Sequence, residues 1–347
     1  MRPGRRRGVA VMVLVVAIAA VAGYVYGSDR GGPSQAHSSV ALAKAHPPHS
    51  SREAGQRARL GAELQRGVDA AAALGGSAEA AIMLDGWHTP VIASSEARGQ
   101  ARFMRMWSMS KVGTMVAVLR GLGWGRRPGR PISPELNEAL HGAITRSENC
   151  RQRRVVLELQ RLSGGTAAAR EALRAVFRDA GAEVRVGTQI APPEENCVDY
   201  LNTQTDLAEP LAPALLLGTS TWRVGDAARL VHALSLNAYG AAVSHEVLGL
   251  MRLPKLPSRE VKPGELTAPL DWGAGESLPP GTPYKAGWGG TLNGNFLAGQ
   301  IALADLPGAG RAALVAVFHP NEQPSRDDPG ITASPQALDT IFSSVGR

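Results

Sequence analysis

The sequence predicts an α+β domain in which both ends of the chain form one antiparallel sheet around a mostly helical middle. Two observations carry this prediction. Short apolar segments separated by turn residues occur in pairs near residues 80–93 and 296–318, as is typical of β-hairpins. Between these pairs the apolar residues recur mostly at helical spacing. Strands at both ends with helices between them imply that the terminal segments share a sheet.

The elements are expected in the following order. A first helix begins after Glu53 and ends near Gly75, because its apolar residues repeat every three or four positions. Strands follow at residues 80–84 and 90–93, and the second hairpin spans 296–304 and 312–318. A final helix covers about 334–344. The middle helices are expected at 110–122, 148–162, 166–180, 224–236 and 243–252. The helix at 166–180 is expected to stop at Gly181, in the left-handed conformation typical of a glycine at a helix end.

The N-terminal region is expected to lie outside the folded domain. Arginines in residues 1–7 precede an apolar stretch, so residues 1–27 are a signal peptide or a membrane anchor, and both readings stay open. Residues 28–52 are rich in Ser, Pro, Gly, Ala and His and are expected to be a disordered linker. Residues 53–347 would form the domain, with a helical subdomain at about 106–254.

Composition and charge are those of an ordinary globular protein. The chain has 347 residues, 44% of them hydrophobic and 19% charged, which allows a sizeable core. Its formal net charge is +7. Four of these charges belong to the arginines near the N-terminus, and the remaining +3 is not the footprint of a nucleic-acid-binding protein. We therefore expect no nucleic-acid partner.

Three short motifs occur in a meaningful order: Ser108-Met109-Ser110-Lys111, Ser147-Glu148-Asn149 and Lys285-Ala286-Gly287. A serine followed three residues later by a lysine places both side chains on one helix face, where the lysine can serve as base if burial and a nearby cation lower its pKa. Each motif alone has an ordinary explanation. These are a helix surface for the first, a helix cap for Ser147, and a solvated edge-strand lysine for Lys285.

The ordered set resembles the S-x-x-K, S-D-N and K-T-G motifs of penicillin-binding proteins and class A β-lactamases. The resemblance covers about residues 53–347 and implies a serine β-lactamase-like fold with no metal or organic cofactor. It also implies roles for individual residues. Ser108 would be the nucleophile and Lys111 its base, Ser147 and Asn149 would relay protons and position the substrate, and Lys285 would attract it. The backbone N–H groups of Ser108 and Trp288 would form the oxyanion hole, and Gly287 would let an extended substrate approach.

Two positions depart from the motifs of this family. Glu148 stands in place of the aspartate, a change we expect to be mild. Ala286 stands in place of a threonine or serine whose hydroxyl, in the family, bonds the substrate carboxylate. Losing such a charge-assisted bond costs about 1.5–3 kcal/mol, so carboxylate recognition is expected to be weakened.

The chain contains two cysteines, Cys150 and Cys197, and in an exported protein a lone pair is expected to form a disulfide. Such a bridge would bring Glu194 and Glu195 toward the site. The resemblance implies a glutamate for deacylation in this part of the chain, although the E-x-x-L-N pattern of class A β-lactamases is absent. Either glutamate could take that role, and an acidic surface loop is the alternative.

The sequence thus predicts an exported serine hydrolase of the cell envelope that acts through an acyl-serine intermediate. Its substrate would be a β-lactam, a peptidoglycan-derived peptide or a related amide or ester, and an uncleaved N-terminal segment would add a membrane contact. The alternative is a noncatalytic binding or scaffolding protein that keeps the same fold. Ala286 and the missing E-x-x-L-N pattern favour that alternative.

Overall fold

The structure is a computed structural model that describes residues 51–96, 102–126, 132–186, 220–253, 274–290, 296–321 and 333–346. All of these belong to one compact unit, Val40–Arg347. The predicted signal or anchor at 1–27 and nearly all of the predicted linker at 28–52 lie outside the described residues. Within those residues, no helix is long and apolar enough to cross a membrane.

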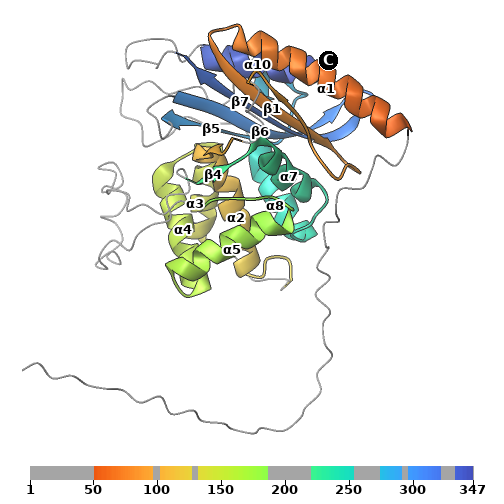
Figure 1. Cartoon of the computed structure of the whole chain (residues 1–347). Helices are drawn as coiled ribbons and strands as arrows, with labels where there is room; N and C mark the ends of the chain where they lie inside the picture. The colour runs from red at the N-terminus through yellow and green to blue at the C-terminus, as the bar shows by residue number, and fades with distance from the viewer. Residues whose placement is uncertain are drawn as a thin grey trace, which may run out of the picture. The chain divides into compact units, whose positions relative to one another are not determined.

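A five-stranded antiparallel sheet joins the two ends of the chain (Figure 1). Its strand order is β2-β1-β7-β6-β5, so the N-terminal strand β1 lies between its hairpin partner β2 and the C-terminal strand β7. The fold class predicted from the two hairpins is therefore confirmed. The strands are β1 (Gly76–Leu84), β2 (Val91–Ser94), β5 (Tyr284–Gly290), β6 (Phe296–Leu306) and β7 (Gly310–Pro320).

Two helices cover one face of the sheet. The N-terminal helix α1 (Ser51–Ala72) and the C-terminal helix α10 (Ala333–Gly346) lie side by side there (Figure 1). The helical repeat of α1 buries Leu60, Leu64 and Val68, as its spacing predicts. The two ends of the chain thus meet in the helical layer as well as in the sheet.

The opposite face of the sheet meets the helical part of the chain (Figure 1). Its centre is α2, whose residues 110–119 are all buried, as expected for a helix surrounded by others. Helix α7 packs directly on the sheet, since a Cβ at Gly225 would touch Ile92 of β2. The helices are α2 (Ser110–Gly121), α3 (Pro134–Thr145), α4 (Asn149–Ser163), α5 (Thr166–Asp179), α7 (Val224–Ser235) and α8 (Ala241–Arg252).

Three short elements that the sequence did not predict lie near the predicted motifs. Strands β3 (Met104–Arg105) and β4 (Thr221–Trp222) form a small separate sheet. The 3₁₀ turn η2 (Trp107–Met109) follows β3 and leads into α2. A fourth short element, the helix α9 (Ala274–Ser277), precedes β5. Sequence periodicity does not reveal elements of two to four residues, because they span less than one repeat.

Most longer elements agree with the sequence prediction to within a few residues. Gly181, the predicted left-handed residue after α5, has φ 67°. Helix α3 was missed, although its start carries a recognisable signal. Ser133 caps the helix by accepting a hydrogen bond from the backbone N–H of Leu136, and Pro134 occupies the first turn, as is typical of helix N-termini.

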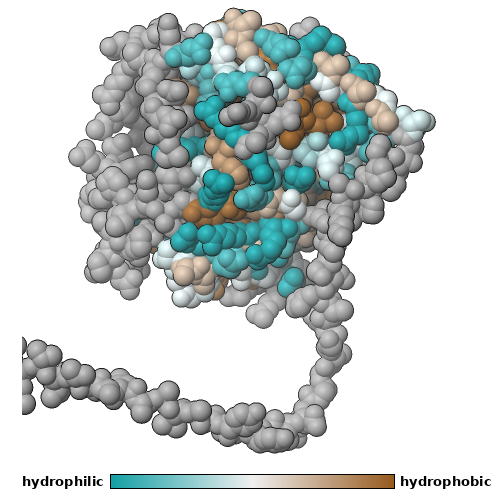
Figure 2. Space-filling model, viewed as in Figure 1, coloured by the Kyte–Doolittle hydropathy of each residue, from teal (hydrophilic) through white to brown (hydrophobic). Residues whose placement is uncertain are grey.

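The described surface does not expose the core. In Figure 2, hydrophilic and hydrophobic residues alternate over the visible face, and hydrophobic residues reach it in small separate areas. Three large hydrophobic side chains of the described residues are exposed: Leu236, Leu253 and Trp288. The first two lie directly after α7 and α8, whereas Trp288 lies within β5.

Candidate active site

Ser108 lies in the middle of η2, directly before α2. The α-helix predicted at 110–122 begins at Ser110, so Ser108 lies in the 3₁₀ turn that precedes it. A 3₁₀ turn still places residues i and i+3 on one face, so Ser108 and Lys111 keep the expected relation. The residue before the nucleophile candidate is strained, because Trp107 has φ 44°, a value that is uncommon for a non-glycine residue.

Lys111 is buried in the first turn of α2, with 3% of its surface exposed. Its Nζ donates to the side-chain oxygen of Asn149 (3.0 Å), to the backbone oxygen of Glu148 (3.3 Å) and to both oxygens of Ser147. Among the described residues, no hydrogen bond joins Lys111 to the Ser108 hydroxyl. Lys111 therefore hydrogen-bonds residues of the second motif, Ser147-Glu148-Asn149, and not the serine of its own motif.

Ser147 lies in the turn between α3 and α4 in a left-handed conformation, with φ 57°. The helix-cap reading of this serine is wrong, because the N-cap position of α4 belongs to Glu148 and the cap makes no side-chain hydrogen bond. The Ser147 hydroxyl instead accepts from Lys285 Nζ at 2.9 Å and from Lys111 Nζ at 3.4 Å. A hydroxyl has two acceptor lone pairs and one donor proton, so this oxygen connects the two lysines.

Lys285 comes from the edge strand of the sheet and is 2% exposed. The reading of this residue as a solvated edge-strand lysine is therefore wrong. Its Nζ also donates to the carbonyl oxygen of Ala286 at 2.8 Å. The side chain of Lys285 thus crosses from the sheet to the α3–α4 turn and connects two elements far apart in sequence.

Gly287 brings the backbone of β5 against the turn that carries Ser108. A Cβ at position 287 would lie 2.9 Å from the backbone nitrogens of both Ser108 and Met109, and 3.0 Å from the carbonyl oxygen of Met106. Real Cβ atoms do not approach backbone atoms this closely, so only glycine fits here. Trp288, the other predicted oxyanion-hole residue, follows directly in the strand.

Ala286 points away from η2. Side chains alternate along a strand, so Ala286 lies on the face opposite to Lys285 and Gly287, and it is 3% exposed. Its partner in β6 is Gln300, whose side-chain oxygen accepts from the backbone N–H of Ala274 at 2.7 Å. The residue that replaces the family's hydroxyl is thus a small buried side chain beside a polar group that is already bonded.

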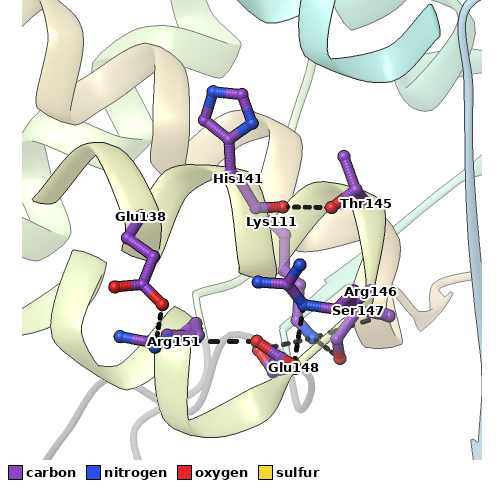
Figure 3. Close-up of polar contacts among 8 residues, drawn as sticks. All are labelled: Lys111, Glu138, His141, Thr145, Arg146, Ser147, Glu148 and Arg151. Atoms are coloured by element: carbon purple, nitrogen blue, oxygen red, sulfur yellow. Dashed lines mark hydrogen bonds and ion pairs between the residues drawn. The ribbon is translucent and has the colours of Figure 1, made fainter. Parts of the chain in front are cut away.

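Buried ion pairs hold the α3–α4 turn in place (Figure 3). Glu148, which is 2% exposed, receives a hydrogen bond from Arg146 Nε at 2.9 Å and lies 3.8 Å from Arg151 Nε. Arg151 also pairs with Glu138 of α3. The carbonyl oxygen of Gly142 accepts from the backbone N–H groups of Arg146 and Glu148. These contacts lie on both sides of Ser147 in the chain, and nothing in the sequence beyond the charges themselves indicates them.

Several predicted residues lie outside the described part of the chain. Glu194, Glu195 and Cys197 fall within the gap between residues 186 and 220. Cys150 is the second residue of α4, directly after Asn149, and it is not a free thiol. Its pairing with Cys197 and the placement of the two glutamates stay predictions.

The described residues bring four predicted side chains, the backbone of Ser108 and one strand edge to the same place. Lys111 and Lys285 share the Ser147 hydroxyl, Asn149 bonds Lys111, and Gly287 lies against the backbone of Ser108. Such a site can move a proton between Lys111 and Lys285 through Ser147, because these three groups are already within hydrogen-bond reach of one another. Within the described residues, no group of His, Cys, Asp or Glu side chains could hold a metal ion.

Solved structures with the same architecture include β-lactamases and PBP-A. A class A β-lactamase from Bacteroides cellulosilyticus is 14% identical, with 82% of this chain and 98% of that one covered and a TM-score of 0.51. A β-lactamase from Chitinophaga pinensis is 16% identical over 82% and 97%, with a TM-score of 0.50. PBP-A is 16% identical over 82% and 94%, also with a TM-score of 0.50.

At these identities the similarity is one of fold. No protein-family model matches the sequence, and no curated protein does. The matched structures nevertheless cover most of both chains. The chain therefore has the α+β fold of class A β-lactamases and PBP-A.

Proposed function

We propose that this protein is a serine hydrolase that works through an acyl-serine intermediate. The observation that carries the proposal is the shared contact at Ser147. Two buried lysines from separate elements, Lys111 and Lys285, both donate to its hydroxyl, close to the turn that holds Ser108. Burying two lysine amino groups is unfavourable unless polar groups compensate. A hydrophobic core does not require such an arrangement.

The reaction would proceed in two steps. The Ser108 hydroxyl attacks the carbonyl carbon of an amide or ester and gives its proton to the neutral amine of Lys111. The carbonyl oxygen becomes an oxyanion, which the backbone N–H groups of Ser108 and Trp288 stabilise. The proton then passes through the Ser147 hydroxyl to the leaving nitrogen or oxygen as the bond to carbon breaks. Water hydrolyses the acyl-serine to a carboxylic acid and restores Ser108.

The remaining parts of the proposal come from the sequence. We propose that the protein is exported, that residues 1–27 direct this export or anchor the chain in the membrane, and that Cys150 and Cys197 form a disulfide. Glu194 or Glu195 would activate the deacylating water. β-Lactams, peptidoglycan-derived peptides and related amides or esters are the candidate substrates.

A noncatalytic binding module is the second candidate, and Ala286 favours it. A position that would offer a hydroxyl to a substrate carboxylate instead carries a buried methyl group. The Lys111–Ser147–Lys285 contacts weigh against this candidate, since a scaffold has no use for two buried lysines at one hydroxyl.

Intact-mass measurement of the protein with an acyl donor tests the proposal. The full chain is incubated with a penicillin and, separately, with 4-nitrophenyl acetate, and adduct formation is followed over time. We expect an adduct on Ser108 from at least one donor, absent in Ser108→Ala. Ser235→Ala is the matched control, because Ser235 hydrogen-bonds Asp85 at the end of α7, and it should acylate normally. If Ser108→Ala acylates as fast as the unchanged protein, the proposed nucleophile is wrong.

A further inference from the structure

An aromatic surface lies along the end of β5 that is farther from Lys285. Trp288 is 39% exposed, and its ring centroid lies 5.9 Å from that of Phe296. On the other face of the strand, the Trp107 indole lies against Gly289, where a Cβ would come within 2.5 Å of its ring. We call Trp107, Trp288 and Phe296 the aromatic cluster.

The cluster lies beside the strand edge that an acyl donor would use. β5 ends the sheet, so among the described strands β6 alone pairs with it. A group laid along an unpaired edge contacts side chains of both strand faces. Trp107 precedes Ser108 directly, and Trp288 follows Gly287, whose backbone lies against Ser108. The two rings therefore lie on opposite faces of β5, next to the backbone that would bind the attacked carbonyl.

The direction of the strand decides which part of the substrate meets these rings. Lys285 contacts Ser147, the proposed proton donor to the leaving group, so the leaving group belongs at the Lys285 end. Phe296 pairs with Gly290 at the other end, roughly 16 Å along a strand that rises 3.3 Å per residue. The acyl part of the substrate therefore extends toward the aromatic cluster.

The side chains at the Gly290 end of β5 are apolar. Tryptophan and phenylalanine rings contribute large apolar areas and pair favourably with other rings. Trp288 is the exposed large hydrophobic residue of the described part of the chain that lies within a strand, whereas the other two lie after helix ends. Its contact with Phe296 makes the exposed apolar surface larger than that of a single ring. Ala286, on the same face as Trp288, adds a methyl group rather than a hydroxyl.

We propose that the aromatic cluster is an acyl-group subsite that selects uncharged aromatic acyl groups, with Trp288 as its specificity-determining residue. This inference rests on the proposed function and adds a substrate class to it. The backbone N–H of Trp288 would serve the oxyanion, while its ring would serve the acyl group. The two tasks are separable by substitution, because a side-chain change leaves the N–H in place.

Two esters with one leaving group test this subsite. 4-Nitrophenyl phenylacetate and 4-nitrophenyl acetate are compared by nitrophenolate release and by intact mass, with each rate divided by the spontaneous rate. We expect a preference for the phenylacetyl ester of about tenfold or more, since burying a ring adds substantial apolar contact. Trp288→Ala should reduce the preference to below about threefold, and Trp288→Phe should keep most of it.

Leu236→Ala removes another exposed hydrophobic side chain and should leave the preference unchanged. A preference that persists in Trp288→Ala, or that is absent from the unchanged protein although Ser108 is acylated, overturns the subsite alone. If neither ester nor a penicillin gives an adduct on Ser108 or a turnover that Ser108→Ala abolishes, the proposed function is overturned together with the subsite. Reaction with the penicillin alone overturns the subsite alone. Circular dichroism of Trp288→Ala separates a lost subsite from a lost fold, and Trp288→Phe gives an independent readout.

Discussion

Two non-glycine residues with positive φ stand beside the nucleophile candidate and in the proton relay. Trp107 has φ 44° and Ser147 has φ 57°. Backbone strain of this kind costs on the order of 1–3 kcal/mol per residue and persists where the surroundings impose it. At Ser147 the surroundings are visible, since Gly142, Glu148 and the two lysines all bond the turn. The strain therefore reflects tertiary contacts rather than local preference.

The strain at Ser147 predicts an unusual order of stability for two substitutions. Ser147→Ala and Ser147→Gly both remove the hydroxyl and its bonds to the lysines, but only glycine adopts a positive φ without steric penalty. We expect Ser147→Gly to be more stable than Ser147→Ala by about 1 kcal/mol, measured by urea unfolding. Elsewhere in a regular helix the order is reversed. An alanine variant as stable as the glycine variant would contradict strain at this position.

At the scale of elements, the site depends on the contact between β5 and η2. The proposed site needs both elements, because β5 supplies Lys285 and the strand edge while η2 supplies Ser108. Their backbones meet at Gly287. The alternation of side chains along β5 then directs Lys285 toward Ser147 and Trp288 toward the other face.

Gly287→Ala is expected to separate these two elements. The added Cβ would meet backbone atoms of Met106, Ser108 and Met109 within 3.0 Å, and backbone cannot move aside as a flexible side chain can. We expect a loss of about 1–3 kcal/mol in the free energy of unfolding, and a fall in Ser108 acylation of about a hundredfold, because a shift near 1 Å is enough for that.

Gly249→Ala is the matched control for this substitution. Gly249 lies in α8 and has no heavy atom within 4 Å of the position its Cβ would take. A glycine-to-alanine change inside a helix stabilises it by roughly 0.5–1 kcal/mol. Acylation should stay unchanged in this variant. If Gly287→Ala acylates at the normal rate, the close approach of β5 to η2 is not needed for activity.

At the scale of the whole molecule, strands β1 and β7 join the two ends of the chain, and each contains a buried ionisable group. Glu79 of β1 and His319 of β7 lie on the same sheet face, since Ser77 pairs with His319 and Glu79 pairs with Val317. Burial raises the pKa of Glu79 from 4.5 to about 8 and lowers the pKa of His319 from 6.5 to about 4. Both groups are thus uncharged in the folded protein near pH 7.

These two pKa shifts predict how stability depends on pH. Between pH 4.5 and 6.5 their effects oppose each other, because folding retains a proton on Glu79 and excludes one from His319. Between pH 6.5 and 8 Glu79 acts alone. The folded protein holds a proton that the unfolded chain has released, so stability falls as pH rises, by about 2 kcal/mol over this range.

Unfolding in urea at pH 6.5 and pH 8 checks this expectation. Glu79→Gln removes the titrating group, so its free energy of unfolding should not show the decrease of about 2 kcal/mol between these two pH values. Glu63→Gln on the surface of α1, where Glu63 pairs with Arg59, should keep the fall of the unchanged protein. If Glu79→Gln loses as much stability as the unchanged protein, Glu79 is already ionised at pH 6.5.

Much of the fold was predictable because it rests on short-range patterns. The apolar repeat of α1, the glycine after α5 and the two hairpins follow from residue preference and spacing, and each was predicted near its observed position. Helix α3, which the apolar spacing did not predict, has a recognisable start signal in Ser133 and Pro134. The short strands β3 and β4 exist through long-range pairing, as between Met104 and Trp222, which no local pattern contains.

By itself, the sequence determined the fold class and the identity of the motif residues, because periodicity and motif order are properties of the chain. Only the tertiary structure decided how the motifs meet. In the structure Lys111 hydrogen-bonds Asn149 and Ser147, and Ser147 accepts hydrogen bonds from two lysines instead of capping a helix. Lys285 is buried, and the backbone of Gly287 lies against that of Ser108. The physical reason is that burial and hydrogen bonding across distant elements depend on packing in space, which sequence spacing does not specify.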